Sequence, residues 1–222
     1  WLSIAAGLTV KIFENVLGNN QQIIRTIPNT PASIKKGVTA IYFNRNCKNK
    51  TINESILLMK AVGETIIVDD ENLMDAYTAV SGSGPAYIFY FVEAIISAAK
   101  EMGINEKNAR ILAEKTLIGS AYLLENTQVR AQDLRKAVTS PKGTTEAGLN
   151  VLMKKDAFFN LTSRAIQKAQ KRGRELGKSW FLTYRMFENQ NKYQDYLSLA
   201  LLELLNENTF YDIKPETIIK KS

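Results

Sequence analysis

The first part of the chain alternates between short apolar stretches and amphipathic ones. The apolar stretches predict strands over residues 2–6, 22–27, 38–43 and 64–70. Amphipathic spacing predicts helices over residues 10–17 and 53–63. Thr9 is suited to cap the first helix, Gly18 to end it in the left-handed conformation, and Gly63 to end the second. Strands that alternate with helices indicate an α/β layer whose sheet is covered by helices.

Beyond residue 70 only helical spacing remains. Helices are predicted over residues 70–80, 86–102, 106–126, 132–138, 145–153 and 157–176. Residues 81–85, SGSGP, interrupt the first two of these, and Pro85 suits the first turn of the helix that follows. Gly103 ends that helix, and Asn105 can cap the next one. The apolar faces are too broad for one small bundle, so we expect pairing with a second copy.

The predicted fold class is therefore α/β followed by all-α, with residues 1–70 and 71–178 as its two domains. Residues 179–222 differ from both, because Tyr and Phe are frequent and the charges nearly balance. This segment contains an amphipathic stretch at 196–207 and no motif that indicates chemistry. We expect a C-terminal extension of unknown role.

The composition is that of an ordinary soluble globular protein, with 45% apolar and 23% charged residues among 222. The longest uninterrupted apolar runs, such as residues 86–92, are too short to cross a bilayer. No secretory signal opens the chain, and we expect that it does not begin where a native protein would, because its first residue is Trp1. The single cysteine, Cys47, cannot form an internal disulfide, which favours a cytoplasmic location.

The net charge is +7, and much of it lies in residues 151–178, which contain eight lysines and arginines but only two acidic residues. Such a segment is either a surface for an anionic partner, nucleic acid included, or the solvated face of an amphipathic helix. Beyond Phe159 no aromatic residue interleaves the charges for base stacking, so we favour the solvated face and expect no nucleic-acid partner.

The chain has no histidine, which excludes a histidine general acid, a Ser–His nucleophile and a histidine metal site within it. One cysteine also excludes a cysteine-rich zinc site, and no metal is predicted. Any chemistry must use hydroxyls, amides, carboxylates, lysines or a cofactor.

Residues 138–148, VTSPKGTTEAG, place hydroxyl side chains and two glycines ahead of a predicted helix. The first amides of a helix lack partners and attract anions, and a small carboxylate matches one turn of amides. The alternative is a plain capping loop that binds nothing, with Thr144 or Thr145 as its N-cap. The spacing alone leaves both interpretations open.

Four blocks of sequence, in order and spacing, resemble pyrroline-5-carboxylate reductases: SIAAGLTV at 3–10, RTIPNTPASIKKGVTAIY at 25–42, AVSGSGPAYIF at 79–89 and LRKAVTSPKGTTEAGL at 134–149. The resemblance implies an NAD(P)H-dependent oxidoreductase of proline biosynthesis. Such an enzyme transfers a hydride to the C=N bond of 1-pyrroline-5-carboxylate and gives L-proline. The resemblance also implies that residues 1–70 are the C-terminal part of a Rossmann domain, followed by a helical dimerisation domain in a homodimer or higher homo-oligomer.

The same resemblance implies particular site residues. Those implied to bind the substrate are Ser140, Gly143, Thr144, Thr145 and Glu71. Those implied to bind the cofactor, NADPH or NADH, are Ile4, Ala5, Ala6 and Asn29. Thr145 is implied to be catalytic, because the second threonine of the TSPxGTT motif lies near the ring nitrogen in such enzymes.

Three features depart from the family. No glycine-rich phosphate loop occurs in the sequence, the segment after Lys178 extends past the usual family end, and Lys142 stands where relatives commonly have glycine. If that position needs a positive φ, lysine costs roughly 1 kcal/mol there. The departures leave an alternative function, a catalytically inactive remnant that acts only as a helical dimerisation module. A β-hydroxyacid dehydrogenase shares the overall plan, but its lysine is missing after Gly84.

Overall fold

The computed structural model describes residues 1–188, with side chains up to residue 178. The chain divides into two units, Trp1–Gly177 and Lys178–Ser222, and the description below concerns the first. Of the predicted C-terminal extension only the backbone of residues 179–188 is described, so the amphipathic stretch at 196–207 lies outside the described residues.

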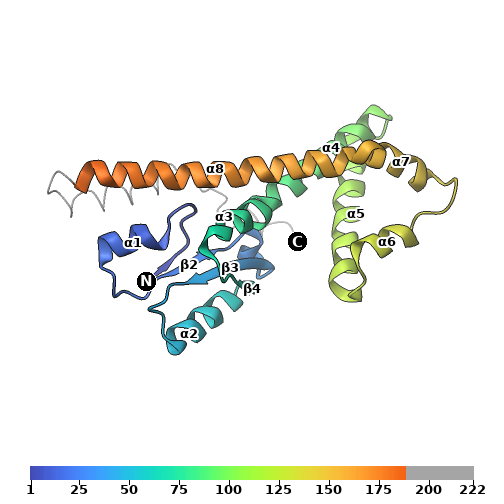
Figure 1. Cartoon of the computed structure of the whole chain (residues 1–222). Helices are drawn as coiled ribbons and strands as arrows, with labels where there is room; N and C mark the ends of the chain where they lie inside the picture. The colour runs from blue at the N-terminus through green and yellow to red at the C-terminus, as the bar shows by residue number, and fades with distance from the viewer. Residues whose placement is uncertain (189–222) are drawn as a thin grey trace. The chain divides into compact units, whose positions relative to one another are not determined.

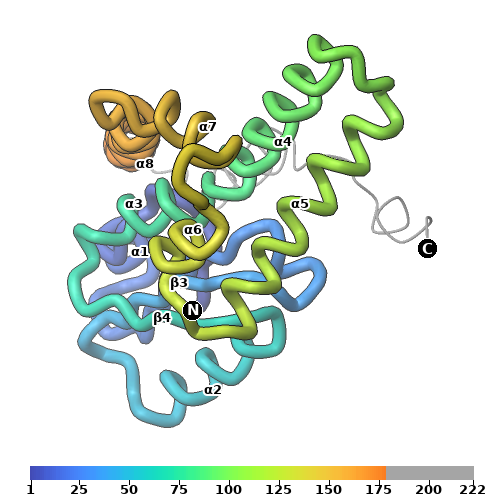
Figure 2. The backbone as a smooth tube through the Cα atoms, turned by 90° about the vertical axis from the view of Figure 1, so that its right-hand side faces the viewer, coloured from blue at the N-terminus to red at the C-terminus, as the bar shows by residue number. Residues whose placement is uncertain are grey.

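Four strands form one mixed sheet in the order β1-β2-β3-β4. The strands are β1 (Leu2–Ser3), β2 (Ile24–Ile27), β3 (Gly37–Phe43) and β4 (Gly63–Ile67). β1 runs parallel to β2 and β3 parallel to β4, whereas β2 and β3 are antiparallel. Helices α2 (Asn49–Lys60) and α3 (Met74–Tyr77) lie on opposite sides of this sheet (Figures 1 and 2). The sheet is therefore covered on both faces, as the alternating pattern predicts.

The core lies between the centre of the sheet and α3. Ile27 and Ala40 face Val68 and Met74 there, and all four side chains are buried. β2 is buried along its whole length, as expected for a strand in the interior of a covered sheet. These contacts hold the end of β2 and the middle of β3 against α3.

Several predicted boundaries in this part were wrong. The first strand ends at Ser3 instead of continuing to residue 6. Gly18 ends α1 (Val10–Leu17) with φ 93° and ψ 152°, which is not the left-handed helical conformation. Gly63 does not end a helix, because α2 stops at Lys60 and Gly63 is the first residue of β4.

The helical part starts with one continuous run. It comprises the 3₁₀ turn η2 (Glu71–Leu73), α3, the π-helical turn η3 (Thr78–Gly82) and α4 (Gly84–Glu101). The SGSGP segment was expected to interrupt the helix, but the chain passes through it as a π turn. The hydroxyls of Thr78 and Ser81 donate to the carbonyls of Met74 and Tyr77, which helps to satisfy the widened turn.

The run Glu71–Glu101 is long and apolar enough to cross a membrane by length and composition, with a mean hydropathy of 1.3 in its most apolar window. The prediction from sequence concerned only uninterrupted apolar runs, and this longer helix includes polar positions as well. Only 6% of that window is buried in the structure. Length and composition are weak evidence for a membrane segment, but so much exposed apolar surface indicates that something else covers it.

The remaining helices are α5 (Glu106–Thr127), α6 (Ala131–Ala137), α7 (Thr144–Met153) and α8 (Ala157–Glu188). Asn105 caps α5 as predicted, accepting from the amide of Asn108. α4 and α5 pack as a hairpin, and α6 and α7 lie on the side of α5 away from the sheet (Figure 1). α8 returns from there until Gly177 touches the loop after β1. The predicted fold class, α/β followed by all-α, is confirmed.

Candidate functional site

The hydroxyl-rich loop connects α6 to α7. Gly143 is the N-cap of α7, so the interpretation of Thr144 or Thr145 as the N-cap is wrong. Both threonines lie in the first helical turn, and both are exposed. Among the described residues, the hydroxyls of Ser140, Thr144 and Thr145 make no hydrogen bond to protein, and the amides of the two threonines also lack an acceptor. The start of α7 therefore presents unpaired donors to solvent.

Gly143 lies close against Ser140 in this loop. A Cβ at position 143 would lie 2.5 Å from Oγ of Ser140. The amide of Gly143 donates to the carbonyl of Ser140 at 3.1 Å, which draws the serine over the helix start. The loop thus brings Ser140, Gly143, Thr144 and Thr145 together.

Lys142 adopts φ 62°, so the condition for backbone strain at this position is met. Its amide donates to Oε2 of Glu146 at 2.7 Å, and this bond holds the left-handed conformation in place. The strain costs roughly 1 kcal/mol relative to glycine. Among the described residues the Lys142 ammonium has no ion pair, so it adds positive charge beside the unpaired amides.

Ile4, Ala5 and Ala6 form a turn between β1 and α1. The Ile4 side chain is 58% exposed, and Ala6 is exposed as well. The amide of Ala5 donates to Oγ of Ser3 at 3.2 Å, which tightens the turn. Gly7 follows with φ 80° and is buried against the backbone of α8. The turn offers a small apolar surface backed by a rigid base.

Glu71 lies next to this turn. Its Oε1 accepts from the amide of Val10 at 2.6 Å and from Nη1 of Arg25 at 2.5 Å. Arg25 is only 3% exposed, and its Nε has no partner among the described residues. Burial raises the pKa of the Asp75 carboxyl one helical turn away, and the Arg25 and Arg174 guanidiniums oppose that rise.

Arg25 was missed by the sequence analysis. A signal existed, because a charged residue within the apolar strand QIIRTI must find a counter-charge when the strand is buried. The sequence does not say which of the acidic residues supplies that charge.

Asn29 is the N-cap residue of the 3₁₀ turn η1 (Thr30–Ile34). Its Oδ1 accepts from the amide of Val38 at 2.9 Å. Asn29 thus fixes the turn after β2 against the start of β3.

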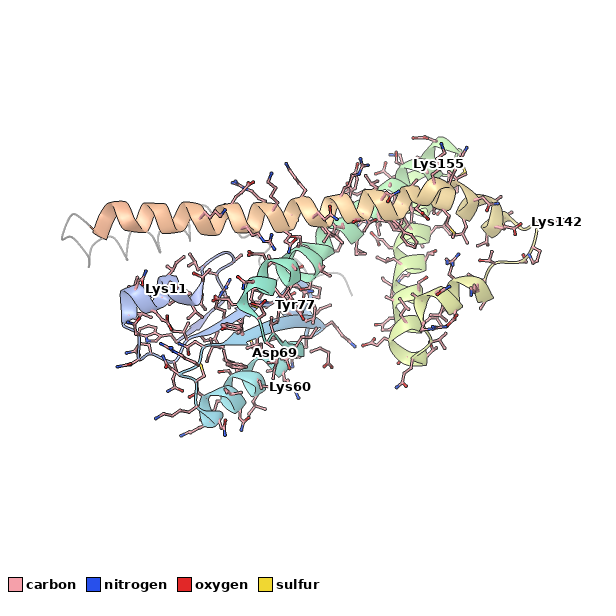
Figure 3. The ribbon with its side chains drawn as sticks, in the orientation of Figure 1. Lys11, Lys60, Asp69, Tyr77, Lys142 and Lys155 are labelled. Carbon is pink, nitrogen blue, oxygen red and sulfur yellow. The ribbon has the colours of Figure 1, made fainter. Side chains whose placement is uncertain are left out.

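The predicted site residues form two separate groups in one chain. Ile4, Ala5, Ala6 and Glu71 gather beside α1, whereas Ser140, Gly143, Thr144 and Thr145 gather at the start of α7. Figure 3 shows Lys142 at the opposite end from Lys11, which lies in α1. No hydrogen bond or ion pair among the described residues joins the two groups.

A dinucleotide fits the residues present only at its nicotinamide end. The exposed apolar turn at Ile4–Ala6 suits a flat ring. The N-terminus of α1 does not suit a phosphate, because the Glu71 carboxylate already accepts from its first amide. The sequence also contains no G-x-G-x-x-G that could cradle a pyrophosphate.

The Cys47 thiol and the acidic side chains are further candidate sites among the described residues. Burial raises the pKa of the Cys47 thiol, which disfavours the reactive thiolate. No group of three or more His, Cys, Asp or Glu side chains among the described residues could hold a metal ion.

Residues 71–176 match the family model described as pyrroline-5-carboxylate reductase dimerisation. A pyrroline-5-carboxylate reductase of Pseudomonas aeruginosa is 36% identical over 177 residues, which is 80% of this chain and 64% of that protein. The chain is thus similar to pyrroline-5-carboxylate reductases along 80% of its length, and residues 71–176 match the dimerisation domain of these enzymes. It spans less than two thirds of the length of this relative, 64%.

Solved pyrroline-5-carboxylate reductases have a similar fold. The structure from Coxiella burnetii has a TM-score of 0.75 at 37% identity and covers 79% of this chain and 64% of that one. The structure from Plasmodium falciparum, solved with NADP bound, has a TM-score of 0.72 at 28% identity, with 79% and 69% covered. The similarity to pyrroline-5-carboxylate reductases thus extends to the sheet and the helices described above.

Proposed function

We propose that this chain carries the substrate loop and the nicotinamide-side turn of a pyrroline-5-carboxylate reductase, an oxidoreductase of proline biosynthesis. The observation that carries the proposal is the start of α7, where unpaired amides and three free hydroxyls surround Gly143. A small carboxylate is the ligand that such a helix start suits best. The similarity to pyrroline-5-carboxylate reductases supports 1-pyrroline-5-carboxylate as the substrate and L-proline as the product.

In this proposal the loop binds and orients the substrate. The amides of Thr144 and Thr145 and the hydroxyl of Ser140 hold the carboxylate, and the Lys142 charge adds to the attraction. The hydroxyl of Thr145 holds the ring nitrogen. A cyclic imine is basic enough to react as the iminium, so a chain without histidine can support the reaction.

NADPH or NADH, when bound, supplies the hydride. The neighbour solved with NADP bound supports this choice of cofactor. Ile4, Ala5 and Ala6 would support the nicotinamide ring beside the C=N bond that accepts the hydride. Most of the rate enhancement then comes from proximity and orientation.

The working site requires a second copy of the chain. The turn of one copy has to meet the α7 loop of another, because the two groups lie apart within one chain. Pairing through residues 71–176 would also cover the apolar run Glu71–Glu101 without a membrane. We propose a homodimer or higher homo-oligomer in the cytoplasm, where a single cysteine needs no disulfide partner.

Thr145→Ala is expected to slow the oxidation of NADPH by pyrroline-5-carboxylate about tenfold or more, on the order of one lost polar contact. Stopped-flow or steady-state absorbance of NADPH measures the rate. Thr139→Ala is the matched control, since that hydroxyl donates to the carbonyl of Arg135 at 2.6 Å and is not part of the donor set. Unchanged kinetics in Thr145→Ala would remove the assignment, and a wild-type chain without any turnover would favour the dimerisation-module alternative.

Mixing two defective variants tests the composite site. Thr145→Ala damages the loop, and Ala6→Trp blocks the turn. If the turn of one copy serves the loop of another, co-expressed variants form mixed dimers with one intact site, and activity reappears. Activity that stays at the level of the separate variants would place both groups of residues in sites within one copy.

A further inference from the structure

Glu71 caps a helix to which it does not belong. The N-cap residue of α1 is Thr9, but its side chain makes no capping bond. The amide of Val10 donates instead to Glu71, which lies 61 residues further along the chain. An orphan amide of a helix start is thus satisfied by a carboxylate from the first turn of the helical domain.

The same carboxylate oxygen neutralises a buried charge. Arg25 is 3% exposed in the middle of β2, and Nη1 donates to Oε1 of Glu71 at 2.5 Å. A buried guanidinium without its counter-ion is costly, so Glu71 cannot leave this position freely. Asp75, one helical turn later on the same face, approaches within 3.3 Å of the space that a Cβ on Gly173 would fill. Acidic side chains of the helical run thus face both β2 and α8.

These bonds enclose the turn Ile4–Thr9 from two directions. At its C-terminal end the turn is bonded to Glu71 through Val10. In its middle, a Cβ on Gly7 would lie 3.1 Å from the amide nitrogen of Gly177, so backbone meets backbone at α8. The exposed Ile4–Ala6 surface is therefore held by two elements that are distant in sequence.

We propose that Glu71 is a positioning residue for the cofactor: it holds the nicotinamide-side turn through the Val10 amide, is itself anchored by Arg25, and does not contact the substrate. The inference rests on the proposed function for the identity of the ligand. It differs from the role implied by the family resemblance, in which Glu71 lines the substrate pocket.

The two roles predict different kinetics. Glu71→Gln keeps the shape of the side chain but removes the charge that binds Arg25 and the α1 amide. If Glu71 positions the turn, the KM for NADPH rises about tenfold while the KM for pyrroline-5-carboxylate changes little, because the loss of a charged partner weakens only the cofactor side. If Glu71 touches the substrate, the KM for pyrroline-5-carboxylate rises instead, and that result would overturn the proposal.

Hydrogen exchange of the purified chain provides a readout that needs no cofactor. The amide of Val10 and the peptide covering residues 4–13 are expected to exchange about tenfold faster in Glu71→Gln, since the amide loses its charged acceptor. Glu64→Gln is the matched control, because Glu64 is an exposed residue of β4 whose side chain makes no hydrogen bond or ion pair among the described residues. Unchanged exchange at residues 4–13 in Glu71→Gln would overturn the proposal.

A double variant distinguishes a local effect on the turn from a general loss of stability. In Glu71→Gln/Arg25→Met the uncompensated guanidinium is removed, so stability should partly recover while exchange at residues 4–13 stays fast. Recovery of slow exchange in the double variant would mean that Glu71 acts only through the buried charge, and would contradict positioning of the turn. If the wild-type chain binds no NADPH, the proposed function fails, and the exchange experiment still decides whether Glu71 holds the turn.

Discussion

Gly63→Ala is expected to destabilise the chain by roughly 4 kcal/mol or more, a large fraction of the stability of an ordinary domain. Two costs add at this residue. Gly63 has φ 145°, a conformation that residues with a Cβ rarely adopt. It also pairs with Gly37 at the start of the parallel β3–β4 ladder, and an added Cβ would overlap the carbonyl of Gly37. Urea unfolding followed by circular dichroism measures the change.

Gly18→Ala separates the two costs. Gly18 also has a positive φ, 93°, but no atom lies within 4 Å of the position of its Cβ. The free energy of unfolding of Gly18→Ala should fall by only about 1–3 kcal/mol, which is the cost of the backbone conformation alone. Equal losses in the two variants would mean that the overlap with Gly37 is relieved by a small shift of β4.

Gly177→Ala is expected to lower the free energy of unfolding by roughly 2 kcal/mol and to weaken NADPH binding. The added methyl group overpacks a backbone contact and forces α8 away from the turn that contains Gly7. The Cβ would overlap the carbonyl of Gly7, which is itself buried and has φ 80°. Gly7 follows the Ile4–Ala6 turn directly. If α8 moves away from Gly7, the turn should become more mobile, and NADPH should bind more weakly. Unfolding in urea and the NADPH dissociation constant measure the two effects.

Gly148→Ala in α7 is the control for this substitution. Gly148 has no atom within 4 Å of its Cβ position, so alanine should stabilise the helix by about 0.5–1 kcal/mol. If Gly177→Ala behaves in the same way as Gly148→Ala, α8 does not support the turn in solution.

The sequence predicted elements whose signals are local. The Asn105 cap and the extents of α1, β3 and α5 follow from residues that lie within a few positions of each boundary. The prediction failed where distant contacts decide. Gly63 looks like a helix terminator in sequence, but its neighbour Gly37 makes it the start of a strand. The SGSGP segment looks like a break, but hydroxyls inside the helix support a π turn there.

The candidate site shows the same limit. The hydroxyl loop could be located from its motif, because all of its members lie within six residues of each other at 140–145. The Glu71 cap could not, since its partners Val10 and Arg25 are recognised only after the sheet has formed. The separation of the two groups of residues was also invisible in the sequence, because it depends on how α4 to α7 are arranged in space. The roles assigned to these residues remain predictions.

The sparse burial of Glu71–Glu101 bears on how this protein must be handled. If copies protect one another's apolar helices, folding is a bimolecular equilibrium, and dilution alone removes part of the stabilisation. Midpoints of heat or urea denaturation would then depend on the amount of protein in the sample. A newly synthesised chain would expose this apolar surface until it pairs with a second copy. Expression at high level would then be prone to aggregation, and chaperones would have an exposed apolar segment to bind.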